Sequence, residues 1–219
     1  MQILLATAYL PPVQWFAHFA AADNVLIEQH EHYLKQTYRN RCIIAGPDGQ
    51  VDLSIPLEKA SSHAEIRDLR ISDHGHWRHH HWNAIRSAYG NSPFFEYYAD
   101  DFAPFYERPA GFLMDFNEAL INLLCRLLDI EPHYERTKAF ISASDVFIKD
   151  LRPLISPRCP YTQDVTFTPK PYYQVFQQRL GFLPNLSVAD LLFNMGPEGL
   201  LVLCDSIRDW RACAPNGQE

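Results

Sequence analysis

Apolar positions near the start of the chain form two short unbroken runs, separated by a stretch with helical spacing. The first run extends from Ile3 to Ala8, a pattern typical of a strand buried on both faces. A loop with two prolines follows, then helical spacing from Pro12 to Ala22 and a second apolar run from Val25 to Ile27. Two buried strands joined by such a helix predict a βαβ unit with a right-handed crossover. The loop after the first strand would then lie at the carboxyl edge of the sheet, where α/β proteins usually bind ligands.

Turn residues divide the next apolar stretches into short strands. Arg41 to Ala45 and Val51 to Pro56 flank the turn Gly46-Pro47-Asp48-Gly49, which predicts a β-hairpin. Apolar and polar residues alternate from Ile66 to Ile71, which predicts a further strand. The first third of the chain is therefore expected to be rich in strands.

Helical spacing dominates the middle of the chain. It predicts helices from Trp77 to Tyr89, from Pro93 to Tyr106 with the proline at the helix start, and from Phe112 to Leu128. Many prolines interrupt the stretch from Ile130 to Pro171, so we expect irregular structure there, with one strand near Lys138 to Ile141.

The last third predicts two consecutive helices. Ser187 can cap a helix from Val188 to Met195, Gly196 would end it, and Pro197 would begin another apolar helix. The expected fold is α/β, with a Rossmann-like βαβ N-terminal half, a hairpin and a helical layer. We expect a single domain over residues 1–210 and a frayed tail over residues 211–219.

Charge and cysteine content narrow the possible partners. The chain has 26 acidic and 19 basic residues and a net charge of -7, which argues against nucleic acid as a partner. Its apolar runs are too short for membrane insertion. The five cysteines are widely spaced and include no CxxC pair, which argues against a disulfide framework and a thiolate zinc site. We therefore expect a cytoplasmic protein that acts on a small molecule.

A histidine cluster extends from His74 to His81. His76 and His80 are four residues apart, so on one helix face they could chelate a metal. Two imidazoles make an incomplete site, however, and the pattern favours exposed or helix-capping histidines over a metal site. His81, next to Trp82, could instead act as an acid or base if it faces the ligand edge of the sheet.

A short basic cluster precedes the predicted hairpin. Its members are Lys35, Tyr38, Arg39, Asn40 and Arg41. Guanidinium groups bind carboxylate or phosphate through paired hydrogen bonds, so this cluster could hold an anionic substrate. The alternative is a solvated loop whose charges pair with Glu28 and Glu31.

Polar residues also interrupt the apolar C-terminal third. Asp190 and Asn194 lie four apart on an otherwise apolar helix, and Tyr172 and Asn185 precede them. Buried polar groups need partners, so these residues either tie loops to the body of the protein or contact a ligand. The chain contains no GxSxG, Walker A or GxGxxG motif, so neither a nucleophile elbow nor a glycine-rich nucleotide loop is indicated.

Three sequence blocks together resemble the WbqC-like family. The first block is Tyr9-Leu10-Pro11-Pro12-Val13-Gln14-Trp15-Phe16 with Ala22-Asp23 and Lys35 through Arg41; the second is His81 through Tyr89 with Ser92-Pro93-Phe94-Phe95; the third is Tyr172 with Leu186-Ser187 through Glu198. The resemblance extends to about Leu203. Motif positions of the family fall on Tyr9, Pro11, Lys35, Asn40, Arg41, Tyr89, Pro93, Asp190, Asn194 and Glu198. The chain departs from the family at Gln29-His30, flanked by Glu28 and Glu31, where many members carry an acidic pair.

The resemblance implies a role in surface-polysaccharide or O-antigen biosynthesis, with transfer of glycine or another acyl group to a sugar or nucleotide sugar. In that scheme His81 accepts a proton and Lys35 stabilises developing negative charge. The expected substrate-binding residues are Tyr9, Gln14, Arg39, Asn40, Arg41, Tyr89, Tyr172, Asn185 and Asp190. This hypothesis requires the proline-containing turn after the first strand and the basic cluster to share one pocket.

Three other functions remain open, and no cofactor can be named. The protein could be a non-catalytic ligand-binding or assembly protein of the same pathway, or a metal-dependent enzyme that uses the His74–His81 cluster. By analogy with nucleotidyltransferase-type Rossmann-like folds it could adenylylate a substrate, although His18 lies too deep in the predicted helix to supply their histidine motif.

Overall fold

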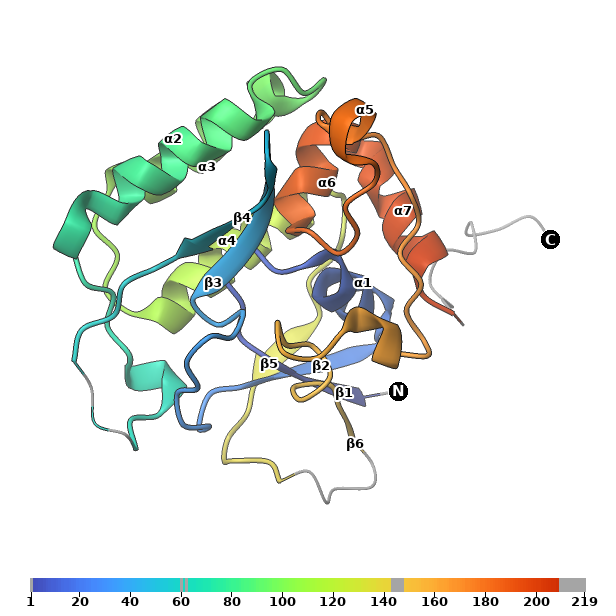
Figure 1. The fold of residues 1–219 in the computed structure, drawn as a ribbon. Helices are drawn as coiled ribbons and strands as arrows, with labels where there is room; N and C mark the ends of the chain where they lie inside the picture. The colour runs from blue at the N-terminus through green and yellow to red at the C-terminus, as the bar shows by residue number, and fades with distance from the viewer. Residues whose placement is uncertain (1, 60, 62, 143–147, 209–219) are drawn as a thin grey trace.

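Four parallel strands form the main sheet, in the order β5-β2-β1-β6, in a computed structural model that describes residues 2–59, 61, 63–142 and 148–208 (Figure 1). The central strands β1 (Gln2–Ala6) and β2 (Asn24–Glu28) pair in parallel, and helix α1 (Val13–Ala21) connects them. Consecutive side chains of β1, Ile3, Leu4 and Leu5, are each at most 1% exposed, so both faces of this strand are buried. The predicted βαβ unit is confirmed.

The two edge strands are short and were not predicted. Strand β5 (Tyr134–Arg136) pairs with β2, and β6 (Ile148–Asp150) pairs with β1. Each has three residues, two of which are charged, so neither shows the apolar run of a central strand. The strand expected from Lys138 to Ile141 is wrong, because these residues form a loop after β5.

The predicted hairpin is confirmed and lies between two helical elements. Strands β3 (Arg41–Gly46) and β4 (Gly49–Ser54) pair in antiparallel fashion. Strand β3 packs against α2 (Trp77–Tyr89) and α6 (Val188–Met195), and Figure 1 shows the hairpin between them. Helix α3 (Phe95–Glu107) lies beside α2. The hairpin thus joins the helical layer to the C-terminal helices.

The strand expected from Ile66 to Ile71 is wrong. Residues Ile66–Asp68 form a 3₁₀ turn, η1, which packs against α4 (Leu113–Leu127), and Arg70 and Ile71 make only isolated bridges. Ile66 and Leu69 are both buried. Their spacing of three residues is that of a 3₁₀ turn, whereas a strand would point them to opposite faces.

The C-terminal helices follow the predicted order. The Oγ of Ser187 accepts a hydrogen bond from the amide of Ala189 at 3.2 Å and so caps α6. Gly196 adopts a φ of 56° at the end of α6, and a 3₁₀ turn leads into α7 (Gly199–Ser206), which packs on α1. The remaining short helical segments are η2 (His74–His76), η3 (Tyr161–Gln163), α5 (Gln177–Leu180) and η4 (Gly196–Glu198). The expected tail over residues 211–219 lies outside the described residues.

Within the described part of the chain, none of the helices combines the length and the apolar character that crossing a bilayer requires.

Candidate functional site

A pocket of about 890 Å³ lies between the loop that follows β2 and the segment that follows β4. Three cationic side chains line it, and they come from both walls: Lys35 and Arg41 from one, Lys59 from the other. Polar side chains and one acid complete the part of the lining that can form hydrogen bonds: Tyr33, Gln36, Asn40, Ser54, Glu58 and Ser61. We call this the basic pocket. Its volume is in the range of sites that hold cofactor-sized ligands.

Asn40 holds the two walls of the basic pocket together. Its side-chain amide donates to the carbonyl of Ile55 at 2.8 Å, and its own carbonyl accepts from the amide of Ile55 at 2.8 Å. Its Oδ1 accepts from the hydroxyl of Tyr33 at 3.1 Å. Because these bonds already use much of its hydrogen-bonding capacity, Asn40 shapes the pocket more than it offers free groups to a ligand.

The cations of the basic pocket are only weakly neutralised. Arg41 donates from Nε to the Ser54 Oγ at 3.3 Å and lies 3.6 Å from Asp52. Among the residues that the structure describes, neither Lys35 nor Lys59 takes part in an ion pair. Three cations therefore face two carboxylates, Glu58 in the lining and Asp52 beside Arg41, so in a protein of net charge -7 the pocket keeps an excess of positive charge that favours an anion.

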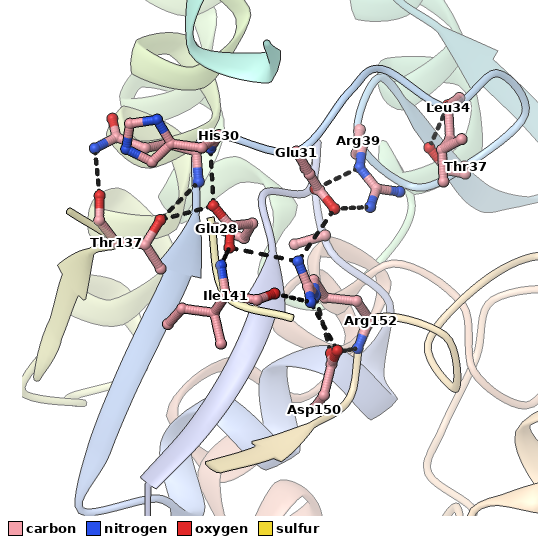
Figure 2. Close-up of polar contacts among 12 residues, drawn as sticks. Glu28, His30, Glu31, Leu34, Thr37, Arg39, Thr137, Ile141, Asp150 and Arg152 are labelled. Atoms are coloured by element: carbon pink, nitrogen blue, oxygen red, sulfur yellow. Dashed lines mark hydrogen bonds and ion pairs between the residues drawn. The ribbon is translucent and has the colours of Figure 1, made fainter. Parts of the chain in front are cut away.

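Arg39 takes a different position from its neighbours in the basic cluster. It is buried, and its guanidinium donates to both oxygens of Glu31, at 2.7 Å and 2.6 Å. This bidentate ion pair belongs to a charge network at the carboxyl ends of the strands (Figure 2). In place of the substrate contact that we expected, the structure gives Arg39 an internal carboxylate partner.

Glu28 and Arg152 are at the centre of that charge network. Glu28 is fully buried and accepts from the amide of His30, the hydroxyl of Thr137 and the amide of Ile141, at 2.8, 2.8 and 2.9 Å. Arg152 lies within 4 Å of Glu28, Glu31 and Asp150 (Figure 2). The network ties the ends of β2 and β6 to the loop after β5. Sequence reasoning missed it because Arg152 lies 124 positions from Glu28.

Tyr9 and His81 meet in the hydrophobic core. The Tyr9 hydroxyl lies 2.9 Å from the His81 Nδ1 and 2.9 Å from the Tyr106 hydroxyl. Burial lowers the pKa of His81 to about 4, and a hydrogen bond to the backbone of Ser54 opposes this only in part. The imidazole is therefore neutral at pH 7 and has one nitrogen bonded to Tyr9. Ser54 lines the basic pocket, so His81 supports its wall from behind.

Gln14 and Asn185 join the start of α1 to two distant loops. The Asn185 Oδ1 accepts from the Gln14 amide at 2.9 Å, and the Gln14 side chain donates to Asp164 at 2.9 Å. His18 lies 2.6 Å from the same carboxylate. Burial opposes ionisation of Asp164, but hydrogen bonds from His18, Gln14 and Thr166 outweigh it and lower the pKa of Asp164. The polar side chains of Gln14, His18, Asn185 and Asp164 therefore form hydrogen bonds within the protein.

Tyr172 and Asp190 form a third internal cluster. The Tyr172 hydroxyl donates to the Asp190 Oδ2 at 2.6 Å, and Gln174 donates to the same oxygen at 3.0 Å. Asn194 donates to the backbone carbonyl of Asp190 at 2.8 Å, and the Tyr89 hydroxyl accepts from the amide of Ala45 at 3.1 Å. The cluster ties α6 to the hairpin and to the 172–174 segment.

The histidine cluster does not converge. His76 has a φ of 50° and precedes α2, so it does not share a helix face with His80. Within residues 2–59, 61, 63–142 and 148–208, no three His, Cys, Asp or Glu side chains are placed to bind one metal ion. A spacing of four residues places two side chains on one face only when both lie inside a regular helix, so the spacing of His76 and His80 did not indicate a metal site.

The proline-containing turn and the basic cluster are in contact through their backbones. The Tyr9 amide donates to the Tyr38 carbonyl at 2.9 Å. The side chains of Tyr9 and Gln14 nevertheless lie in the interior, and among the described residues none from 9 to 14 lines the basic pocket. The expectation that the turn and the basic cluster share one pocket is therefore wrong, and the basic cluster forms its pocket with the segment that follows β4 instead. Of the expected site residues, the structure brings Lys35, Asn40 and Arg41 together. Lys59, Tyr33 and Gln36 join them without having been singled out by any motif.

A family model and a protein of known sequence both match this chain. A family model described as the WbqC-like protein family matches residues 7–151, which include both walls of the basic pocket. A protein of Mycobacterium tuberculosis (strain ATCC 25618 / H37Rv), named Uncharacterized protein Rv1507c, is 28% identical over 217 residues, covering 89% of this chain and 94% of that protein. No solved structure matches the chain significantly.

Proposed function

Because this chain belongs to the WbqC-like protein family, we propose that it serves polysaccharide biosynthesis and that its basic pocket binds a nucleotide sugar or another phosphorylated sugar. The observation that carries this proposal is the convergence of Lys35, Arg41 and Lys59 on one pocket. A diphosphate carries the negative charge that these cations match, and a pocket of about 890 Å³ has room for a nucleotide sugar.

The reaction that we propose is transfer of a small acyl or aminoacyl group from an activated donor to an amine or hydroxyl group of the bound sugar. The acyl carbon bonds to the acceptor nitrogen or oxygen as its bond to the donor's leaving group breaks, and the proton of the acceptor passes to that leaving group. Arg41 and Lys59 hold the phosphate groups from the two walls of the basic pocket. In acyl transfer, negative charge develops on the carbonyl oxygen, and a nearby ammonium group such as that of Lys35 stabilises it. Asn40 fixes the distance between the walls through its bonds to Ile55 and Tyr33.

A non-catalytic ligand-binding or assembly protein of the same pathway is the second candidate. The position of His81 favours it: this expected proton acceptor is buried and hydrogen-bonded to Tyr9 rather than exposed in the basic pocket. A binding protein needs the cations but no base. Turnover of an acyl donor by the purified protein in the presence of a nucleotide sugar would exclude this second candidate.

Removing two pocket cations is expected to weaken nucleotide-sugar binding. The double variant Lys35→Gln/Arg41→Gln should bind UDP-glucose at least about tenfold more weakly, because each charge-assisted hydrogen bond contributes about 1.5–3 kcal/mol. Isothermal titration calorimetry measures this directly. The control is Lys170→Gln/Arg179→Gln, which removes the same charges from exposed positions. Equal affinity of both double variants and the wild type for UDP-glucose would contradict the proposal.

A further inference from the structure

A second pocket, of about 470 Å³, lies at the carboxyl end of β2. It is lined by His30, His32, Glu65, Lys138, Ala139 and Phe140. None of these described residues lines the basic pocket, although both pockets use the chain segment that follows β2. The carboxyl edge of a parallel sheet is where α/β proteins commonly place ligand sites. We call this the His30 pocket.

One ring nitrogen of His30 has a partner and the other has none. The Nδ1 of His30 lies 3.0 Å from the Glu65 Oε2, and Arg67 donates to the same carboxylate at 2.8 Å. A carboxylate oxygen accepts hydrogen bonds, so Nδ1 of His30 carries the proton directed at Glu65, and Nε2 is the ring nitrogen left for another partner. This Nε2 is buried and has no hydrogen-bond partner among the described residues. Since buried polar atoms are rarely unpaired, Nε2 is a candidate for contact with a ligand.

The opposite wall of the His30 pocket is a loop that is fixed in place. Glu28 accepts from Thr137 and Ile141 at the two ends of the loop, and the Gln29 side chain donates to the Thr137 carbonyl at 2.6 Å (Figure 2). The loop therefore presents Lys138 and Phe140 on a rigid support rather than on a mobile tip.

Lys138 and Phe140 offer two further kinds of contact. Lys138 is exposed and takes part in no ion pair among the residues that the structure describes. The Phe140 ring is 57% exposed, and the Arg152 guanidinium lies 5.4 Å from its centre. An ammonium group attracts an anion, whereas an exposed aromatic ring packs against the apolar C–H face of a sugar.

We propose that the His30 pocket binds an anionic monosaccharide, independently of the function proposed for the basic pocket. Lys138 pairs with the carboxylate or phosphate of the sugar. Nε2 of His30 forms a hydrogen bond with one of the hydroxyl groups of the sugar, which can donate or accept. Phe140 packs against the ring. A volume of about 470 Å³ suits a ligand of this size.

Four probe molecules test how much the anionic group and the hydroxyl groups of the sugar each contribute to binding in the His30 pocket. Glucuronate and glucose 6-phosphate carry both the hydroxyl groups and an anionic group, and they distinguish a carboxylate ligand from a phosphate ligand. Glucose lacks the anion, and cyclohexanecarboxylate lacks the hydroxyl groups. We expect at least one anionic sugar to bind about tenfold or more tightly than both glucose and cyclohexanecarboxylate, because each incomplete probe leaves a polar group of the site unpaired.

Two variants locate the binding in the His30 pocket. Lys138→Gln, at an exposed position, should lower the affinity for the anionic sugar about tenfold, and His30→Phe should abolish the discrimination against cyclohexanecarboxylate. Lys170→Gln is the matched control for charge.

Binding that shifts the imidazole Nε2 resonance of His30 in NMR spectra supports the site. No binding of either anionic sugar, or binding that Lys138→Gln leaves unchanged, overturns it. Loss of UDP-glucose binding in the basic-pocket variant leaves this result unaffected, so the two proposals fail separately.

Discussion

Replacing Arg152 with methionine is expected to lower the free energy of unfolding by about 3–5 kcal/mol. The guanidinium is the shared counter-ion of Glu28, Glu31 and Asp150, at distances of 3.4, 3.8 and 2.7 Å. Its side chain is only 9% exposed, and that of Glu28 is fully buried. Methionine keeps the apolar stem of the side chain but removes the positive charge, so that three carboxylates with little exposure to solvent lose a counter-ion that they share. Urea denaturation of the two proteins measures the difference.

The matched control for this change is Arg179→Met. Arg179 pairs with Asp48 at 2.8 Å, but both side chains are largely exposed, so the pair is expected to contribute less than about 1 kcal/mol. If Arg152→Met and Arg179→Met lower the free energy of unfolding equally, the charge network in Figure 2 does not stabilise the fold as argued.

Replacing Asp190 with asparagine is expected to change how stability depends on pH. Burial raises the pKa of Asp190 to about 6, although hydrogen bonds from Tyr172, Tyr89 and Gln174 act in the opposite direction. In the unfolded chain an aspartate has a pKa of about 3.9. Between these values the folded protein holds a proton that the unfolded chain has released. The stability contribution of Asp190 is therefore present at low pH and is lost as pH rises through about 6.

The size of the full effect is about 3 kcal/mol, from a pKa difference of about two units. Asparagine accepts the same hydrogen bonds at its carbonyl oxygen but does not ionise. The stability of Asp190→Asn relative to the wild type should therefore increase by about 2 kcal/mol between pH 4 and pH 7, because the unfolded aspartate is already about half ionised at pH 4. Urea titrations at both pH values provide the measurement, and Asp205→Asn removes a carboxylate from an exposed position as the control. A difference between variant and wild type that stays constant with pH would contradict the assignment.

The sequence predicted the site in part. Lys35, Asn40 and Arg41 were recognised as a basic cluster, and they line one pocket. Arg39 belongs to the same cluster in sequence, but its side chain meets Glu31 in the interior instead. Charge type and spacing alone do not distinguish these two outcomes, because the direction of each side chain in a loop depends on the backbone conformation. No signal in the sequence would have linked His30 to Glu65, which is 35 positions away.

Short-range patterns determined most of the secondary structure. The βαβ unit, the hairpin, α2 and the Ser187 cap were all predicted, because apolar periodicity and turn residues act within a few positions. The strands β5 and β6 were missed, since each has only three residues and gains its stability by pairing with a central strand. The strand expected from Ile66 to Ile71 did not form, because in the part of the chain that the structure describes these residues make isolated bridges and pair with no strand.

By itself, the sequence determined the α/β class, the order of its main elements and the presence of an unusual basic cluster. The tertiary structure decided which polar groups meet: Arg152 with Glu28, Tyr9 with His81, and Lys59 with Lys35 and Arg41. The physical reason is that secondary structure depends largely on neighbours in the chain, whereas ion pairs and pockets depend on side chains that folding brings together from distant positions.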